Sequence, residues 1–207
     1  MLHVGEYMSK AKVVTVSGAS GAGKTTVVKL LAKKLNCDVL LFDDYANQDS
    51  YPDDMKKWLA AGANVSAIKT PDFVSALQGL ILNSTSDYIF IEEPFGKERN
   101  AIAPFIDYVV LLDQPLDLCL MRIIKRHTEH EHSSSLNSIS RFLDKYEDHL
   151  RESYIATVNQ VRRNSDLIVN EVLSAKATTN MISEWLKSLL VIPKPLEDTG
   201  FSKSIKG

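Results

Sequence analysis

The stretch GASGAGKTT, Gly18 to Thr26, has the spacing of a phosphate-binding loop: a glycine, four residues, then Gly-Lys-Thr. Before it, KVVTVSG is a short β-branched apolar run, which predicts a buried strand over residues 12–17. After it, KTTVVKLLAKKLN has apolar residues at helical spacing, which predicts a helix that begins at the loop. Because the motif needs a strand before it and a helix after it, we predict a nucleotide-binding loop rather than a chance glycine-rich turn.

The residue types in this loop match what the phosphates of a nucleotide require. Glycines let backbone N–H groups turn towards phosphate oxygens with no Cβ in the way, and the following helix N-terminus adds partial positive charge. Lys24 can reach the β- and γ-phosphates of ATP, and the Thr25 hydroxyl can ligate Mg²⁺. The predicted ATP-binding residues are Gly18, Ala19, Ser20, Gly21, Ala22, Gly23, Lys24, Thr25 and Thr26.

Further short apolar runs alternate with helical patterns along the rest of the chain. The predicted strands lie in DVLLFDDY, DYIFIEEPFG, IDYVVLLDQP and SDLIVN. The predicted helices lie in PDDMKKWLAAGAN, TPDFVSALQGLILNS (with Thr70 as its cap), PLDLCLMRIIKRH, SISRFLDKYEDHLRESYIATVNQVRR and AKATTNMISEWLKSLL. Apolar strands that alternate with helices are typical of an α/β fold. We therefore predict a P-loop NTPase three-layer sandwich: a mostly parallel five-stranded sheet with helices on both faces and a lid.

Composition limits the classes of partner. A formal charge of −2 over 207 residues argues against general binding to nucleic acid or to a membrane surface. No apolar run approaches the roughly 20 residues that a membrane span needs. The first residues, MLHVGEYMSKAK, lack the apolar core of a signal peptide, and Cys37 and Cys119 have no pairing pattern. We expect a cytoplasmic protein with reduced cysteines.

Acidic residues follow the predicted strands, at the edge where ligands bind in parallel sheets. Mg²⁺ at a phosphate loop usually needs an acid from the end of another strand. YIFIEE ends in Glu92 and Glu93, and YVVLLD ends in Asp113. We assign the metal to Thr25 and Glu92, because Asp113 precedes a Pro-helix junction where an acid serves as a helix cap.

Several short motifs resemble one family of small-molecule kinases. The chain has no Asn-Lys-x-Asp motif, which a GTPase normally carries to read guanine. FDDY, directly after the second predicted strand, resembles the Gln-Asp-(Asp/Ser)-Phe signature of uridine kinases and nicotinamide riboside kinases. TPDFVSAL, IFIEEPFG and LLDQPLDLCLMRIIKRH resemble the segments that follow it in that family, in the same order. The resemblance runs from about residue 11 to about residue 190, and only the phosphate loop is specific by itself.

The resemblance implies roles for individual residues and a domain organisation. Asp43 would be the base that faces the acceptor hydroxyl, Asp72 would bind a ribose-like diol, and Arg122 and Arg126 would join Lys24 in catalysis. Tyr45 and Glu93 complete the predicted acceptor site, although Glu93 stands where the family has glycine. We expect an N-terminal extension over 1–10, a P-loop kinase domain over 11–192 with a lid at about 127–141, and a flexible tail over 193–207.

Each assignment has a structural alternative. Asp43 is also a residue that caps turns, and Asp72 lies in a first helical turn, where any acid is favoured. Arg122 and Arg126 are spaced to pair with Glu129 on a helix surface. The predicted lid holds His127, His130 and His132, which we interpret as solvated residues rather than a metal cluster, and Trp58 is as well suited to the core as to an acceptor pocket.

The sequence thus predicts an ATP- and Mg²⁺-dependent kinase for a hydroxyl of a small, nucleoside-like acceptor. Pantothenate and sugars are the other acceptors that such a kinase would take. A second function is a nucleotide-binding protein that has lost transfer and acts as a sensor or partner. The predicted lid favours the second reading, because TEHEHSSSLNSIS has no arginine before Arg141, whereas the lid of the kinase family is usually rich in arginine.

Overall fold

The computed structural model describes residues 11–130 and 135–190, which form one parallel sheet with helices around it. Its strands are β1 Lys12–Ser17, β2 Asp38–Leu41, β3 Tyr88–Glu92, β4 Tyr108–Leu112 and β5 Leu167–Val169. They lie in the order β2-β3-β1-β4-β5, and every neighbouring pair is parallel. The predicted P-loop α/β fold is therefore confirmed, with a sheet that is parallel throughout the described residues.

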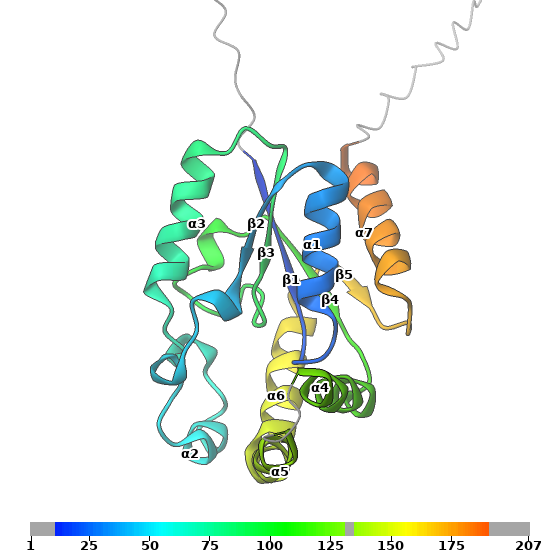
Figure 1. Cartoon of the computed structure of the whole chain (residues 1–207). Coiled ribbons are helices and arrows are strands. Elements are labelled where there is room, and N and C mark those ends of the chain that lie inside the picture. The colour runs from blue at the N-terminus through cyan, green and yellow to red at the C-terminus, as the bar shows by residue number, and fades with distance from the viewer. Residues whose placement is uncertain (1–10, 131–134, 191–207) are drawn as a thin grey trace, which may run out of the picture.

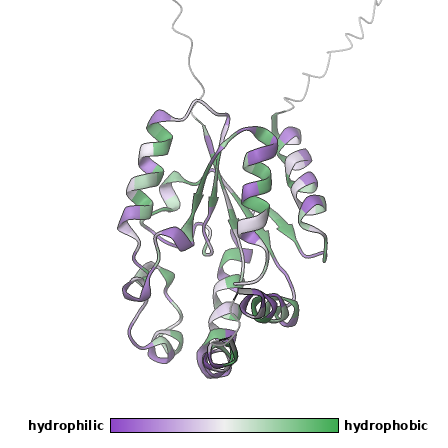
Figure 2. Cartoon of the chain, viewed as in Figure 1, coloured by the Kyte–Doolittle hydropathy of each residue, from purple (hydrophilic) through white to green (hydrophobic). Residues whose placement is uncertain are grey.

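The sheet is apolar on both faces because successive strand side chains alternate between two cores. In β4, Val109 and Leu111 pack on one side, and Val110 and Leu112 pack on the other. Helices α1 (Lys24–Leu35) and α7 (Ala175–Leu190) cover the second side and contact each other. Helix α3 (Pro71–Asn83) and the end of α6 (Arg151–Arg162) cover the first side. Figure 2 shows the strands mostly hydrophobic, while the helices carry hydrophilic residues on their outer sides.

The remaining helices gather at the carboxyl ends of the strands. They are α2 (Met55–Ala60), α4 (Leu116–His130), α5 (Ser135–Lys145) and a π-helical turn, η5 (Tyr146–Leu150), that leads into α6. Residues 11 and 190 lie at the opposite end of the sheet (Figure 1). Within the described chain, none of the helices has the length and apolarity that a bilayer span would require.

The second predicted strand is shorter than expected. Strand β2 stops at Leu41, and Phe42–Asp44 form a 3-10 turn, η1, in which the N–H groups of Tyr45 and Ala46 both donate to the Phe42 carbonyl at 3.0 Å. Phe42 is fully buried and makes edge-to-face pairs with Phe73 and Phe95. Each such pair contributes about 0.5–1.5 kcal/mol beyond burial. The two pairs together exceed the roughly 1 kcal/mol range of strand propensities, so the packing of Phe42 ends the strand at Leu41.

The prediction of a loop in TEHEHSSSLNS is wrong for the residues that the structure describes. Helix α4 continues to His130, and α5 begins at Ser135, so most of the predicted lid over 127–141 is helical; residues 131–134 lie outside the described chain. The long helix expected from Ser138 is instead the continuous helical run of α5, η5 and α6. Serines suggested a loop, but Phe142 of α5 packs against His127 of α4 and Tyr146 of η5, which ties the helix to its neighbours.

One predicted helix start and one predicted helix cap also differ. Helix α2 begins at Met55, with the Asp54 carboxylate accepting from the Lys57 N–H, rather than at the preceding proline. Helix α3 begins at Pro71 as predicted, but the Thr70 side chain makes no cap hydrogen bond. The Thr70 hydroxyl instead accepts from Arg99, a residue 29 positions along the chain. A tertiary contact has therefore taken the side chain that local sequence assigned to the helix end.

Candidate active site

The phosphate loop lies between the end of β1 and the start of α1, as the motif predicts. Gly18, Gly21 and Gly23 all have positive φ angles, 136°, 81° and 100°, which a residue with a side chain rarely adopts. A Cβ on Gly18 would lie 2.6 Å from the Leu112 carbonyl oxygen, and one on Gly21 would collide with the backbone of Cys119 in α4. The glycines therefore let the loop curl and let β4 and α4 approach it closely.

The loop's two functional side chains meet a single carboxylate. The Thr25 hydroxyl donates to Glu92 Oε2 at 2.8 Å, and Lys24 Nζ lies 3.6 Å from Glu92 Oε1 and donates to the Ala19 carbonyl at 3.1 Å. Lys24 and Glu92 are only 7% and 2% exposed. Glu92 ends β3, which is hydrogen-bonded directly to β1, so sheet order brings the two together. Of the two acids considered for a metal, Glu92 is the one beside Thr25.

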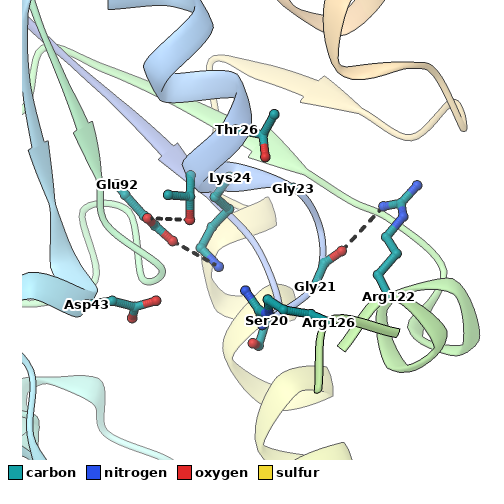
Figure 3. A pocket seen from close by; sticks show the side chains of 10 residues that line it. Ser20, Gly21, Gly23, Lys24, Thr26, Asp43, Glu92, Arg122 and Arg126 are labelled. Atoms are coloured by element: carbon teal, nitrogen blue, oxygen red, sulfur yellow. Dashed lines mark hydrogen bonds and ion pairs between the residues drawn. The ribbon is translucent and has the colours of Figure 1, made fainter. Parts of the chain in front are cut away.

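A cavity of about 220 Å³ opens over this loop. Its walls combine loop residues with one acid from η1, one acid from β3 and two arginines from α4. They are Ser20, Gly21, Gly23, Lys24, Thr25, Thr26, Asp43, Glu92, Arg122 and Arg126. Figure 3 shows Asp43 on the opposite side of the cavity from Arg122, with Lys24 between them. Asp43 is exposed, so its carboxylate is available to a ligand in the cavity.

The arginines of α4 approach the loop from the other side. Arg122 Nη1 donates to the Gly21 carbonyl at 3.3 Å, which ties α4 to the loop, and Arg126 lies one turn further along the helix. Within the described residues, Glu129 pairs with Lys125, at 3.9 Å, and not with either arginine. Two cations on one side of the cavity and carboxylates on the other suit a ligand with anionic phosphates and a polar acceptor end.

The remaining loop residues support the cavity from behind. Gly18, Ala19 and Ala22 do not line it. Ala19 and Ala22 are buried in the core beneath α1 and α7. The Gly18 N–H donates to the Pro94 carbonyl at 3.4 Å. These residues therefore fix the loop's shape, while the other predicted loop residues face the ligand space.

Three residues predicted for the acceptor site lie outside this cavity. Tyr45 packs edge-to-face on Phe73, and Asp72 is exposed in the first turn of α3. Glu93 is fully buried on the other side of the β3 end from Glu92 and pairs with Arg99. Burial raises the pKa of the Glu93 carboxyl, and the Arg99 guanidinium opposes that rise. Glu93 is therefore a structural carboxylate in this state rather than a direct ligand for an acceptor.

Other residues considered from sequence also have structural roles. Trp58 is buried, and its indole N–H donates to the Asn64 carbonyl at 2.9 Å. Asp113 neither caps α4 nor faces Thr25; Arg162 Nε donates to its Oδ2 at 2.9 Å and Nη2 to its Oδ1 at 2.8 Å. The described residues contain no cluster of three potential metal ligands, and His127 lies against Phe142. Arg141 is exposed.

Sequence reasoning missed two residues near the site. Arg99 lies in the polar run GKERN, which reads as a solvated turn, yet it is 1% exposed. Tyr154, on α6, lies close to the loop residue Ser20, and burial raises the pKa of its hydroxyl to about 12. No local pattern marks either residue. An arginine among polar neighbours is ordinary at a surface, and a tyrosine on an amphipathic helix is ordinary in a core.

Comparison with known proteins gives distant, full-length matches. No protein-family model matches the chain. The uridine kinase of Staphylococcus epidermidis is 23% identical over 209 residues, covering 88% of this chain and 99% of the relative. The uridine kinase of Macrococcus caseolyticus is 24% identical over 211 residues, covering 89% and 100%. Both similarities extend well beyond the phosphate loop.

Solved structures with low sequence identity share the fold. A sugar kinase from Janibacter superposes with a TM-score of 0.53 at 14% identity, covering 86% of this chain and 95% of its own. TT1252 from Thermus thermophilus gives a TM-score of 0.55 at 15% identity, covering 87% and 99%. The chain therefore has a P-loop kinase-like fold and distant similarity to uridine kinases over its length.

Proposed function

We propose that this protein is an ATP- and Mg²⁺-dependent kinase that transfers a phosphoryl group to a hydroxyl of a small acceptor. The observation that carries the proposal is the position of Asp43. Its carboxylate lines the same cavity as Lys24, Thr25 and the α4 arginines. A nucleotide-binding loop alone needs no acid there. A kinase does, because a carboxylate can take the hydroxyl proton and orient the oxygen for in-line attack.

The loop residues fit the nucleotide and its metal. Loop N–H groups and Lys24 would hold the phosphates, and Arg122 and Arg126 would face the charge that develops on the transferred group. Thr25 and Glu92 supply two hard oxygen ligands in contact with each other. This small protein donor set suits Mg²⁺, which is commonly bound by one or two carboxylates together with phosphates and waters. Bound Mg²⁺ would neutralise phosphate charge at this position.

A nucleoside or related ribose compound is the acceptor class that we propose. The distant similarity to uridine kinases and the FDDY motif support it. Tyr45 and Asp72 stay candidates for the acceptor site if that site extends from Asp43 towards the start of α3. Pantothenate and sugars are the competing acceptors. Two free cysteines, Cys37 and Cys119, support a reducing compartment such as the cytoplasm as the place of action.

The direct test is phosphoryl transfer to a panel of hydroxyl compounds, with product detected by mass spectrometry as well as by ADP release. We expect transfer to at least one ribonucleoside, and transfer at least about a hundredfold slower in the Asp43→Asn variant under the same conditions. The second candidate function is nucleotide binding without transfer. The exposed position of Arg141, the first arginine after the α4 pair, favours it, because that residue adds no cation to the cavity. ATP binding with no phosphorylated product from any acceptor would support this second function.

Binding of ATP should stabilise the fold in a Mg²⁺-dependent manner. A ligand that binds only the native state stabilises it by about 2.7 kcal/mol at a hundredfold excess over its dissociation constant. We expect MgATP to raise the melting temperature, and excess EDTA to remove most of the rise. For the Glu92→Gln variant, we expect the rise in melting temperature to be as small without EDTA as it is for the wild type with EDTA. A nucleotide-induced shift that is equally large with EDTA would argue against the metal assignment to Thr25 and Glu92.

Arg126→Ala should slow transfer more than it weakens ATP binding. The charge of Arg126 is most useful when the phosphoryl group is between donor and acceptor, so its loss should lower kcat by roughly 10²-fold. Lys125→Ala is the matched control, because Lys125 is exposed on the same helix and pairs with Glu129. A wild-type kcat in Arg126→Ala would mean that Arg126 is a surface residue with no role in transfer. Arg122 would then be the α4 arginine that faces the transferred phosphoryl group.

A further inference from the structure

The buried ion pair between Glu93 and Arg99 has no assigned role. Arg99 Nε donates to Glu93 Oε1 at 3.1 Å, and Nη2 donates to Oε2 at 2.5 Å, so the two planar groups meet along two bonds. The Arg99 side chain is 2% exposed, and the Glu93 side chain is 0% exposed. The Phe95 N–H also donates to Glu93 Oε1, at 3.2 Å, so the carboxylate is held from two sides.

Arg99 uses its other donors to hold the approach to α3. Its Nη1 donates to the Thr70 hydroxyl at 2.8 Å and to the Ile68 carbonyl at 3.3 Å. Thr70 is the residue before Pro71, where α3 begins. A residue between β3 and β4 thus fixes the end of the segment that runs from η1 to α3, on the acceptor side of the sheet.

The same guanidinium holds the residue next to Asp43. The Arg99 Cζ atom lies 5.1 Å from the centre of the Phe42 ring, within the range of a cation–π contact. The ring is enclosed further by Phe73 and Phe95, with ring centres 5.9 and 5.8 Å away. Asp43 follows Phe42 in a tight 3-10 turn, so the direction of its carboxylate depends on where that ring sits.

Glu93 is also the immediate neighbour of Glu92. Glu92 faces the phosphate loop on one side, and Glu93 faces Arg99 on the other. Buried ion pairs contribute little net stability, since desolvation offsets their attraction, and apolar residues of similar size often serve as well. The fold does not need charges here. A guanidinium with all its partners aligned does fix the relative positions of the segments that it joins.

We propose that Glu93 and Arg99 are positioning residues: their ion pair sets the relative placement of the Asp43 and Glu92 carboxylates in the cavity wall. The effect on catalysis rests on the proposed kinase function. The pair joins the end of β3 to the η1 turn and the start of α3. It therefore fixes the segment that carries Asp43 relative to Glu92, which contacts the phosphate loop. Neither residue touches the cavity, and neither is expected to contact ATP.

The test compares Arg99→Lys with Arg162→Lys. Lysine keeps the charge beside Glu93 but loses the planar fork, so it cannot make the four contacts at once. Arg162 makes a similar two-bond pair with Asp113 outside the cavity and serves as the matched control. We expect Arg99→Lys to lower kcat by about 10- to 100-fold, with the Kd for ATP within about twofold of wild type, as small misplacements of reacting groups do. Wild-type kcat in Arg99→Lys would overturn the proposal.

A double variant separates positioning from stability. Glu93→Leu with Arg99→Met leaves no buried charge unpaired, so we expect it to melt at a higher temperature than Arg99→Met alone and to show the same loss in kcat. Wild-type kcat in this variant would also contradict the proposal. If the double variant fails to fold, Arg99→Lys decides the question by itself.

Hydrogen exchange tests the placement without any activity. In Arg99→Lys, backbone amides of residues 42–46 and 68–74 should exchange faster than in wild type, while those of 18–26 should not change. Unchanged exchange in the first two segments would overturn the positioning role. If the wild-type protein phosphorylates no acceptor, the kinase proposal fails, and the exchange result still decides whether the ion pair holds these segments.

Discussion

Asp43→Asn is expected to slow phosphoryl transfer by about 10²–10⁴-fold, the usual cost of losing a general base. Asparagine keeps the size of the side chain and some hydrogen bonding but cannot accept the hydroxyl proton. Asp43 is exposed, so we expect the fold to tolerate the change. The Kd for ATP, measured by calorimetry, should stay close to the wild-type value, because Asp43 enters the cavity from the side opposite the arginine Arg122 (Figure 3).

Asp44→Asn is the control for this variant. Asp44 is also exposed and adjacent in sequence, but it does not line the cavity. Strand alternation does not separate the two acids, because both lie in the η1 turn. The cavity lining separates them instead. Equal rates in wild type and Asp43→Asn would mean that the acceptor hydroxyl lies elsewhere, and a selective loss in Asp44→Asn would move the base by one residue.

Lys24→Ala is expected to lower ATP turnover by about 10²–10³-fold or more, the usual cost of losing one donor to the charge that develops in the transition state. The ammonium group lies beside Glu92 in the wall of the cavity, where it can reach phosphates that enter the loop. ATP affinity should fall as well, because Lys24 would contact the nucleotide in its ground state. Turnover by ADP release and affinity by calorimetry check the two effects separately.

Lys24→Ala also leaves a buried carboxylate without its cation. Glu92 keeps its hydrogen bond from Thr25 but loses the nearby ammonium, so we expect a lower melting temperature in the absence of nucleotide. Lys29→Ala, which removes an exposed lysine from the same helix, should change neither turnover nor stability. Wild-type turnover in Lys24→Ala, in a protein that is still folded, would contradict the phosphate-loop assignment.

Local pattern was enough to predict the sheet, the phosphate loop and the position of several site residues. The run KVVTVSG folds as β1, and the glycines of GASGAGKTT take the positive φ angles that their spacing predicts. Asp43 and Glu92 could be found because parallel strands end at one edge, so acids that follow such strands gather there. Arg122 and Arg126 could be found because helical spacing puts residues one turn apart on one face.

Sequence alone could not assign side chains whose partners lie far along the chain. Glu93 resembled an acceptor ligand and Thr70 a helix cap until Arg99 took both as hydrogen-bond partners. Asp113 resembled a helix cap or a metal ligand, but its partner Arg162 lies 49 residues away. The serines of α5 suggested a loop, and the contact of Phe142 with His127 on α4 is likewise one that local composition does not show.

The sequence by itself determined the shape of the loop, because that shape follows from the glycine positions and from the adjoining strand and helix, which are local properties. Only the tertiary structure decided which carboxylates face the cavity and which are buried in ion pairs outside it. Adjacent side chains such as Glu92 and Glu93 emerge on opposite sides of one strand end. Whether each meets Thr25 or Arg99 depends on which segments fold beside it, because the free energy of a buried charge is set by the partners around it.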